Sequence, residues 1–158
     1  MQNSNILQAG LLIAVLALPA STLAAYSPFA ALAGNWSGGG ILQSADGTQE
    51  RLRCRAGYDV GGVELRLNLR CASASYNFDL TSDVQYRGGA ITGTWHEASR
   101  NAAGTLSGRA GNGQIEASAR GENFSAELSL ITRGKRQIVS LRPQGVNITQ
   151  VSLELDRR

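Results

Sequence analysis

The sequence has few of the side chains on which most catalytic and metal sites depend. Its 158 residues include one His, His96, and two Cys, Cys54 and Cys71. The segment that follows His96 lacks the second His of an H-E-x-x-H zinc motif, and no G-x-S-x-G nucleophile motif occurs. Two Cys and one distant His also fall short of a zinc ligand set. We therefore predict a protein that is not an enzyme, with no catalytic site, no metal site and no cofactor.

Lysine and aromatic residues are also scarce. Lys135 is the only Lys beside fourteen Arg, and the formal net charge is +3. Arginine binds carboxylate and phosphate through two parallel hydrogen bonds, so this excess suits contact with anions. Aromatic residues make up 6% of the chain and are not interleaved with the arginines, as they are in many nucleic-acid-binding surfaces. Nucleic acid is therefore not an expected partner.

Only one long apolar run is present, from Ile6 to Leu18. It is followed by Pro19 and the small residues around Ala24 and Ala25, which is the pattern of a cleavable signal peptide. The run is too short for a comfortable membrane span, and no second apolar run follows. We expect residues 1–25 to be a bacterial Sec-type signal peptide and residues 26–158 to form one domain without a transmembrane span. The expected location is the periplasm or the exterior.

Export gives the cysteine pair a simple interpretation. An even number of Cys in a small exported domain favours a disulfide, because the compartment is oxidising. We predict that Cys54 and Cys71 are bonded to each other.

From Trp36 onward, apolar and polar residues alternate with a period of two, which is the period of side chains along a strand. Glycine-rich breaks recur about every ten residues, as a meander of antiparallel strands requires. The predicted fold is all-β, a single antiparallel up-and-down barrel of about 8–10 strands, with a β-sandwich as the alternative. The expected strands are 35–43, 49–58, 63–72, 76–87, 90–97, 103–109, 114–120, 123–132, 136–142 and 147–155.

The alternation in the second and third strands separates two faces. Cys54 and Cys71 lie on the apolar face, and the opposite face carries five arginines. That face is a candidate contact for an anionic envelope surface or an acidic partner protein. Alternatively, it is a solvated face whose charge prevents aggregation. Asp79 and Asp83 of the next strand are placed to neutralise part of it. The five residues are Arg51, Arg53, Arg55, Arg66 and Arg70.

The inward positions of the later strands are often small, including Gly93, Ala117, Ala119 and Ala126. Ten strands closed into a barrel enclose more volume than such side chains fill, so a ligand cavity is expected if the sheet closes. Larger side chains of the same parity are candidates for lining an apolar pocket. They are Trp36, Tyr76, Phe78, Tyr86, Trp95, Phe124 and Leu128.

The segment Leu32-Ala33-Gly34-Asn35-Trp36 resembles the opening motif of the calycin superfamily, the lipocalin-like barrels. Glycine allows the chain to bend into its first strand, and Trp closes one end of the barrel. The resemblance implies that an Arg from the end of the last strand covers this Trp, and Arg157 stands at the matching place. A second Gly-x-Trp, Gly93-Thr94-Trp95, hints at an internal repeat.

Two functions remain open from the sequence. The first is a non-enzymatic periplasmic barrel that binds a small apolar ligand or lipid in its interior. The second is an envelope protein-interaction module, such as an inhibitor of a secreted or periplasmic enzyme.

Overall fold

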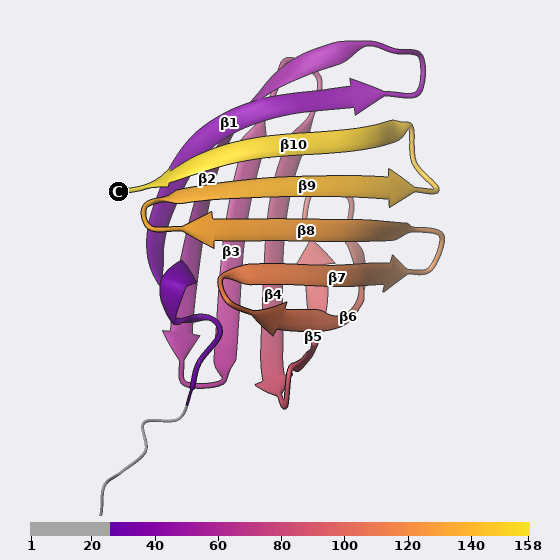
Figure 1. Cartoon of the computed structure of the whole chain (residues 1–158). Coiled ribbons are helices and arrows are strands. Elements are labelled where there is room, and N and C mark those ends of the chain that lie inside the picture. The colour runs from indigo at the N-terminus through magenta and orange to yellow at the C-terminus, as the bar shows by residue number, and fades with distance from the viewer. Residues whose placement is uncertain (1–25) are drawn as a thin grey trace, which may run out of the picture.

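The computed structural model describes residues 26–158, which form one antiparallel sheet closed into a barrel (Figure 1). The predicted signal peptide, residues 1–25, lies outside the described residues. A 3₁₀ turn, η1 (Ala30–Leu32), precedes the strands. The strands are β1 (Gly34–Ser44), β2 (Gln49–Gly61), β3 (Glu64–Ala72), β4 (Asn77–Arg87), β5 (Ala90–Glu97), β6 (Ala102–Gly111), β7 (Gln114–Gly121), β8 (Ser125–Arg133), β9 (Arg136–Gln144) and β10 (Ile148–Arg157).

Each strand pairs with the next one in sequence, and β10 pairs with β1 to close the barrel. Figure 1 shows β7 to β10 crossing in front of β2 to β4 at a steep angle, on the opposite wall. The up-and-down barrel is therefore confirmed over the sandwich. All ten expected strands are present, and their ends differ from the expected ones by at most three residues.

The alternation of side chains explains why these segments form strands. In β2, for example, Leu52, Cys54, Ala56 and Tyr58 point inward and are buried, whereas the arginines between them are exposed. Cys54 lies directly opposite Cys71 in the β2–β3 ladder, and the predicted disulfide joins them. In the chain-entropy model, closing a loop of this size stabilises the fold by about 3 kcal/mol.

The segment before β1 closes one end of the barrel. Phe29 and Leu32 are 0% and 2% exposed, and Trp36 beside them is 1% exposed. The indole Nε1 of Trp36 donates a hydrogen bond of 2.7 Å to the carbonyl oxygen of Leu32. The guanidinium of Arg157 lies 4.8 Å from the centre of the Trp36 ring. The placement of Arg157 over Trp36 that the calycin resemblance implies is thus confirmed.

Gly34 has a φ of +109°, which glycine tolerates far better than other residues, as expected for the bend into β1. The two Gly-x-Trp segments are not equivalent, however. Trp36 lies at the closed end, whereas Trp95 lies near the far end of β5, at the other end of the barrel. The hint of an internal repeat is therefore wrong. In the described part of the chain, no helix is long and apolar enough to span a membrane.

Candidate functional site

The closed end of the lumen is tightly filled and holds a polar network. Gln137 is completely buried. Its Oε1 accepts a hydrogen bond of 2.7 Å from the hydroxyl of Tyr58, and its Nε2 donates one of 3.2 Å to the hydroxyl of Thr132. Burial raises the pKa of the Tyr58 hydroxyl, an effect that its hydrogen bond to Gln137 only partly offsets. This network therefore stays neutral at physiological pH and anchors β2, β8 and β9 to one another.

The middle of the lumen is less completely filled. Leu67, Leu106 and Leu128 point inward from β3, β6 and β8 but are only half-buried. Each lies within a strand that is paired on both sides, so neighbouring strands do not expose it. We infer that the exposed part of these side chains faces the lumen. We call the region that they line, between β3–β4 and β6–β9, the open lumen.

Trp95 lies against the wall of the barrel at the end opposite η1 and is 8% exposed. An added Cβ on Gly104 would lie 2.9 Å from Trp95 Cε2, and one on Gly121 would lie 3.1 Å from Trp95 Cζ2. The ring of Phe124 meets the indole edge-to-face at 5.4 Å. The indole Nε1 donates to the carbonyl oxygen of Thr105 at 3.2 Å. Glycines on β6 and β7 thus make room for the indole of Trp95, which is buried.

A second aromatic pair lies at and just before the start of β4, the strand that pairs with β5. Tyr76 and Phe78 are stacked with their ring centres 6.1 Å apart, and the guanidinium of Arg100 lies 4.9 Å from the Phe78 ring. Arg100 belongs to the β5–β6 turn, which Glu97 holds together. The Glu97 carboxylate accepts hydrogen bonds from the backbone N–H groups of Asp79 and Arg100 at 2.9 Å each.

Burial raises the pKa of Glu97, but its hydrogen bonds from backbone N–H groups and from Ser99 outweigh that effect, so the pKa is lowered overall. The hydrogen bonds of the turn therefore keep this carboxylate ionised at neutral pH. In residues 26–158, no three His, Cys, Asp or Glu side chains gather in a way that would hold a metal ion.

The structure divides the predicted pocket residues between the two ends. Trp36 and Tyr86 lie at the closed end, where Tyr86 contacts Phe29 with ring centres 6.3 Å apart. The other five lie toward or at the end opposite η1, and their role in ligand binding stays a prediction. They are Tyr76, Phe78, Trp95, Phe124 and Leu128.

The small inward residues only partly behave as expected. Ala117 and Ala126 are 5% and 2% exposed, so little space is left beside them, whereas Ala119 is half-buried. An added Cβ on Gly93 would lie 2.2 Å from the carbonyl oxygen of Asp83. This glycine is needed because two strands approach closely.

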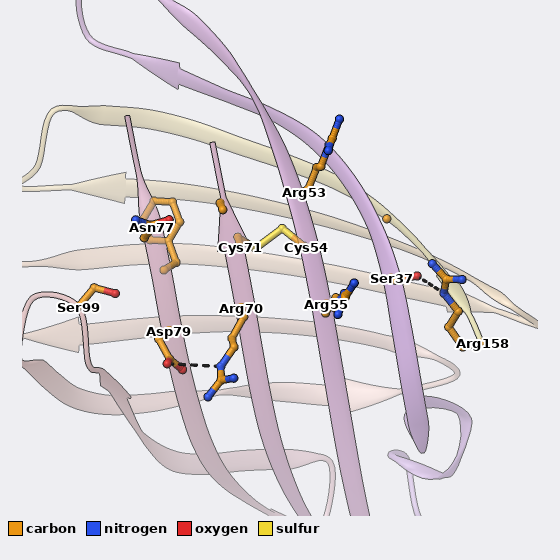
Figure 2. Close-up of a pocket in the computed structure, with 13 residues that line it drawn as sticks. Ser37, Arg53, Cys54, Arg55, Arg70, Cys71, Asn77, Asp79, Ser99 and Arg158 are labelled. Carbon is orange, nitrogen blue, oxygen red and sulfur yellow. Dashed lines mark hydrogen bonds and ion pairs between the residues drawn. A yellow bond between two sulfur atoms is a disulfide. The ribbon is translucent and has the colours of Figure 1, made fainter. Parts of the chain in front are cut away.

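A second hollow lies on the outer face of β1 to β4, with a volume of about 620 Å³. One side is a row of paired positions, Ser37, Arg55, Arg70 and Asp79, and the other is the row Arg53, Ala72 and Asn77. Its floor is the backbone of the row between them, which includes both cysteines. Arg158 and Ser99 complete the lining. We call this hollow the arginine groove (Figure 2).

Three of the five predicted arginines, Arg53, Arg55 and Arg70, line this groove. Arg51 and Arg66 lie outside it, and Arg66 forms an ion pair of 2.8 Å with Asp83. The predicted partial neutralisation by Asp79 and Asp83 is confirmed, since Arg70 Nε lies 3.4 Å from the Asp79 carboxylate.

Arg158 also lines the groove, although the sequence does not predict it. Its guanidinium donates a hydrogen bond to the hydroxyl of Ser37. The two residues come together because the β1–β10 ladder closes the barrel, and no local sequence signal reveals that pairing.

Comparison with known proteins gives a fold relationship only. No protein-family model matches the chain, and no curated protein matches it. Among solved structures, the chain is similar to an S-type phycobiliprotein lyase from Guillardia theta, with a TM-score of 0.62 and 9% sequence identity. The match covers 82% of this chain and 89% of the lyase chain. The chain therefore shares its barrel fold with that lyase.

Proposed function

We propose that this protein is a non-enzymatic binding barrel that holds a small apolar ligand or lipid in the open lumen. One observation carries the proposal. Leu67, Leu106 and Leu128 point inward from fully paired strands and are nevertheless half-buried. A close-packed interior leaves few voids larger than a water molecule, so an apolar lumen that solvent reaches is typical of a binding cavity.

The chemistry of the walls defines the class of ligand. Apolar side chains dominate the open lumen, and the polar groups among them are already paired. The Ser82 hydroxyl donates to the carbonyl oxygen of Thr94 at 2.8 Å, and the Glu97 carboxylate is occupied by its turn. Two aromatic pairs lie at the end opposite η1. The ligand is therefore bound by burial of apolar area and by contact with aromatic rings.

The similar solved barrel is named as a phycobiliprotein lyase. At 9% identity the likeness concerns the fold, so we infer no substrate from that name. It supports the proposal only in that the same barrel architecture occurs in a protein with that activity.

Binding of the uncharged fluorescent probe N-phenyl-1-naphthylamine tests the proposal. We expect saturable binding by the unmodified protein and a loss of affinity of tenfold or more in Ala119→Phe, because the new ring fills the lumen beside Leu106, its cross-strand partner. Ala103→Phe is the matched control, since Ala103 is exposed on the outer face of β6. Binding that is absent, or equally reduced in both variants, would contradict the proposal.

A second candidate function is an envelope protein-interaction module, which the arginine groove favours. A purified complex with an acidic partner protein, formed by a preparation that does not bind the apolar probe, would support this second function over the first.

We also propose that the protein works in a bacterial periplasm or outside the cell, after removal of residues 1–25. The apolar run from Ile6 to Leu18 and the disulfide support this location. Intact-mass analysis of the protein from its own cells should give a chain that begins at Ala25 or Tyr26. A mass that includes residues 1–24 would contradict it.

A further inference from the structure

The arginine groove has an excess of positive charge, with four arginines and one carboxylate among the residues that line it. Two outward arginines elsewhere form ion pairs with a carboxylate on the neighbouring strand, Arg66–Asp83 at 2.8 Å and Arg136–Asp156 at 3.8 Å. Within the groove, only Arg70 has such a partner, at Asp79. The described residues give neither Arg53 nor Arg55 an ion pair.

The register of the strands explains this excess. Arg53 lies between Gly39 and Ala72, and Arg55 lies between Ser37 and Arg70. Arg55 and Arg70 are therefore directly opposite each other, a placement that puts the Cβ atoms of two like charges about 5 Å apart and opposes folding. An anion between the two guanidinium groups relieves that repulsion.

A further arginine adds positive charge at the β1 side of the groove. Arg158 is held beside Arg55 by its hydrogen bond to the Ser37 hydroxyl. Figure 2 shows Arg55 between the Ser37–Arg158 pair and the Arg70–Asp79 pair. Four guanidinium groups and one carboxylate thus surround a hollow whose volume of about 620 Å³ lies in the usual range for small-molecule sites.

We propose that the arginine groove binds a ligand that carries two or more phosphate groups. A phosphate group offers several oxygens and up to two negative charges, so it accepts hydrogen bonds from two guanidinium groups at once. A carboxylate has one charge and two oxygens, which a single Arg satisfies. The Asn77 amide at the uncharged end of the groove provides a further donor.

This site is separate from the open lumen. The arginines point outward from β2 and β3, and the Cys54–Cys71 disulfide lies on the inner face beneath the groove floor. The protein therefore has an inner apolar site and an outer anionic site on one barrel. Phosphate groups of this kind belong either to soluble polyphosphates or to the headgroups of phosphate-bearing lipids.

Calorimetric titration with inorganic tripolyphosphate at low ionic strength tests the proposal. We expect one saturable site, weakened tenfold or more in the double variant Arg53→Gln/Arg55→Gln. The control is Arg87→Gln/Arg133→Gln, which removes the same charge from exposed arginines outside the groove and should keep the affinity within twofold. Citrate, a tricarboxylate, should bind at least tenfold more weakly than tripolyphosphate.

Sedimentation with vesicles that contain phosphatidylglycerol separates the two sources of phosphate. Binding that tripolyphosphate displaces, and that the groove variant loses, assigns the site to lipid headgroups. Tripolyphosphate binding without vesicle binding assigns it to soluble ligands. Equal losses in both double variants, equal affinity for citrate, or no saturable binding would overturn the proposal. The groove variant should still bind the apolar probe, so this test is independent of the lumen.

Discussion

Trp36 and Arg157 form the contact that fastens the last strand to the closed end. The guanidinium lies 4.8 Å from the ring centre and also donates to the carbonyl oxygen of Ala31. Cation–π contacts contribute about 0.5–2 kcal/mol, so Arg157→Met should lower the free energy of unfolding by about 1–2 kcal/mol. Arg158→Met, one residue later and exposed, should change it by less than about 0.5 kcal/mol. Urea denaturation measures both, and equal effects would contradict the role of Arg157.

Gly104 makes room for Trp95, and substitution there should be costly. An added Cβ would lie 1.8 Å from the carbonyl oxygen of Arg120 and 2.9 Å from Trp95 Cε2. Gly104→Ala should therefore destabilise the fold by about 1–3 kcal/mol through overpacking. Gly111→Ala meets nothing within 4 Å and should be neutral or stabilising. Thermal unfolding that ranks the two variants in the opposite order would contradict this interpretation.

At the residue scale, sequence patterns predict which way a side chain points better than they predict how tightly it is packed. Parity along a strand identifies Leu128 and Phe78 as inward because side chains alternate. The filling of the space around them depends on the opposite wall, which parity does not describe. Ala117 and Ala126 are buried and Ala119 is half-buried, and no local pattern separates these three alanines.

The β5–β6 turn should make stability depend on pH through Glu97. The pKa of Glu97 is lowered from its ordinary value of 4.5 in the folded state, so its contribution is fully present above about pH 4.5 and is lost as the pH falls through the lower, folded value. Glu97→Gln should therefore be most destabilising above pH 4.5, and the difference from the unmodified protein should shrink below it.

Urea denaturation between pH 3 and pH 7 measures this dependence. The exposed Glu122→Gln in the β7–β8 turn serves as the control. A destabilisation by Glu97→Gln that stays constant over the whole pH range would show that the charge of Glu97 does not stabilise the turn.

Strands and turns were the most predictable features of this chain. Period-two alternation and regularly spaced glycines suffice to define ten strands, and the facing parity of Cys54 and Cys71 suffices for the disulfide. The arginine groove was only partly predictable. Arg55 and Arg70 meet through a local hairpin, whereas Arg158 joins them through the closure of β1 on β10.

At the scale of the whole molecule, packing varies within the barrel, even between the cross-strand partners Ala119 and Ala126, and substitutions should reveal the difference. Ala126→Leu enters a site that is 2% exposed and should cost about 1–3 kcal/mol. Ala119→Leu enters the open lumen and should be tolerated within about 0.5 kcal/mol or stabilise the fold. Equal losses of melting temperature in the two variants would indicate a lumen that is packed throughout.

The central claim is that an apolar molecule enters the open lumen, and methyl NMR of Leu-labelled protein tests it most directly. On titration with N-phenyl-1-naphthylamine, the methyl resonances of Leu67, Leu106 and Leu128 should shift in a saturable manner. Those of Leu32 and Leu155, buried at the closed end, should not move. Resonances of the three lumen leucines that stay unchanged at high probe concentration would contradict the account.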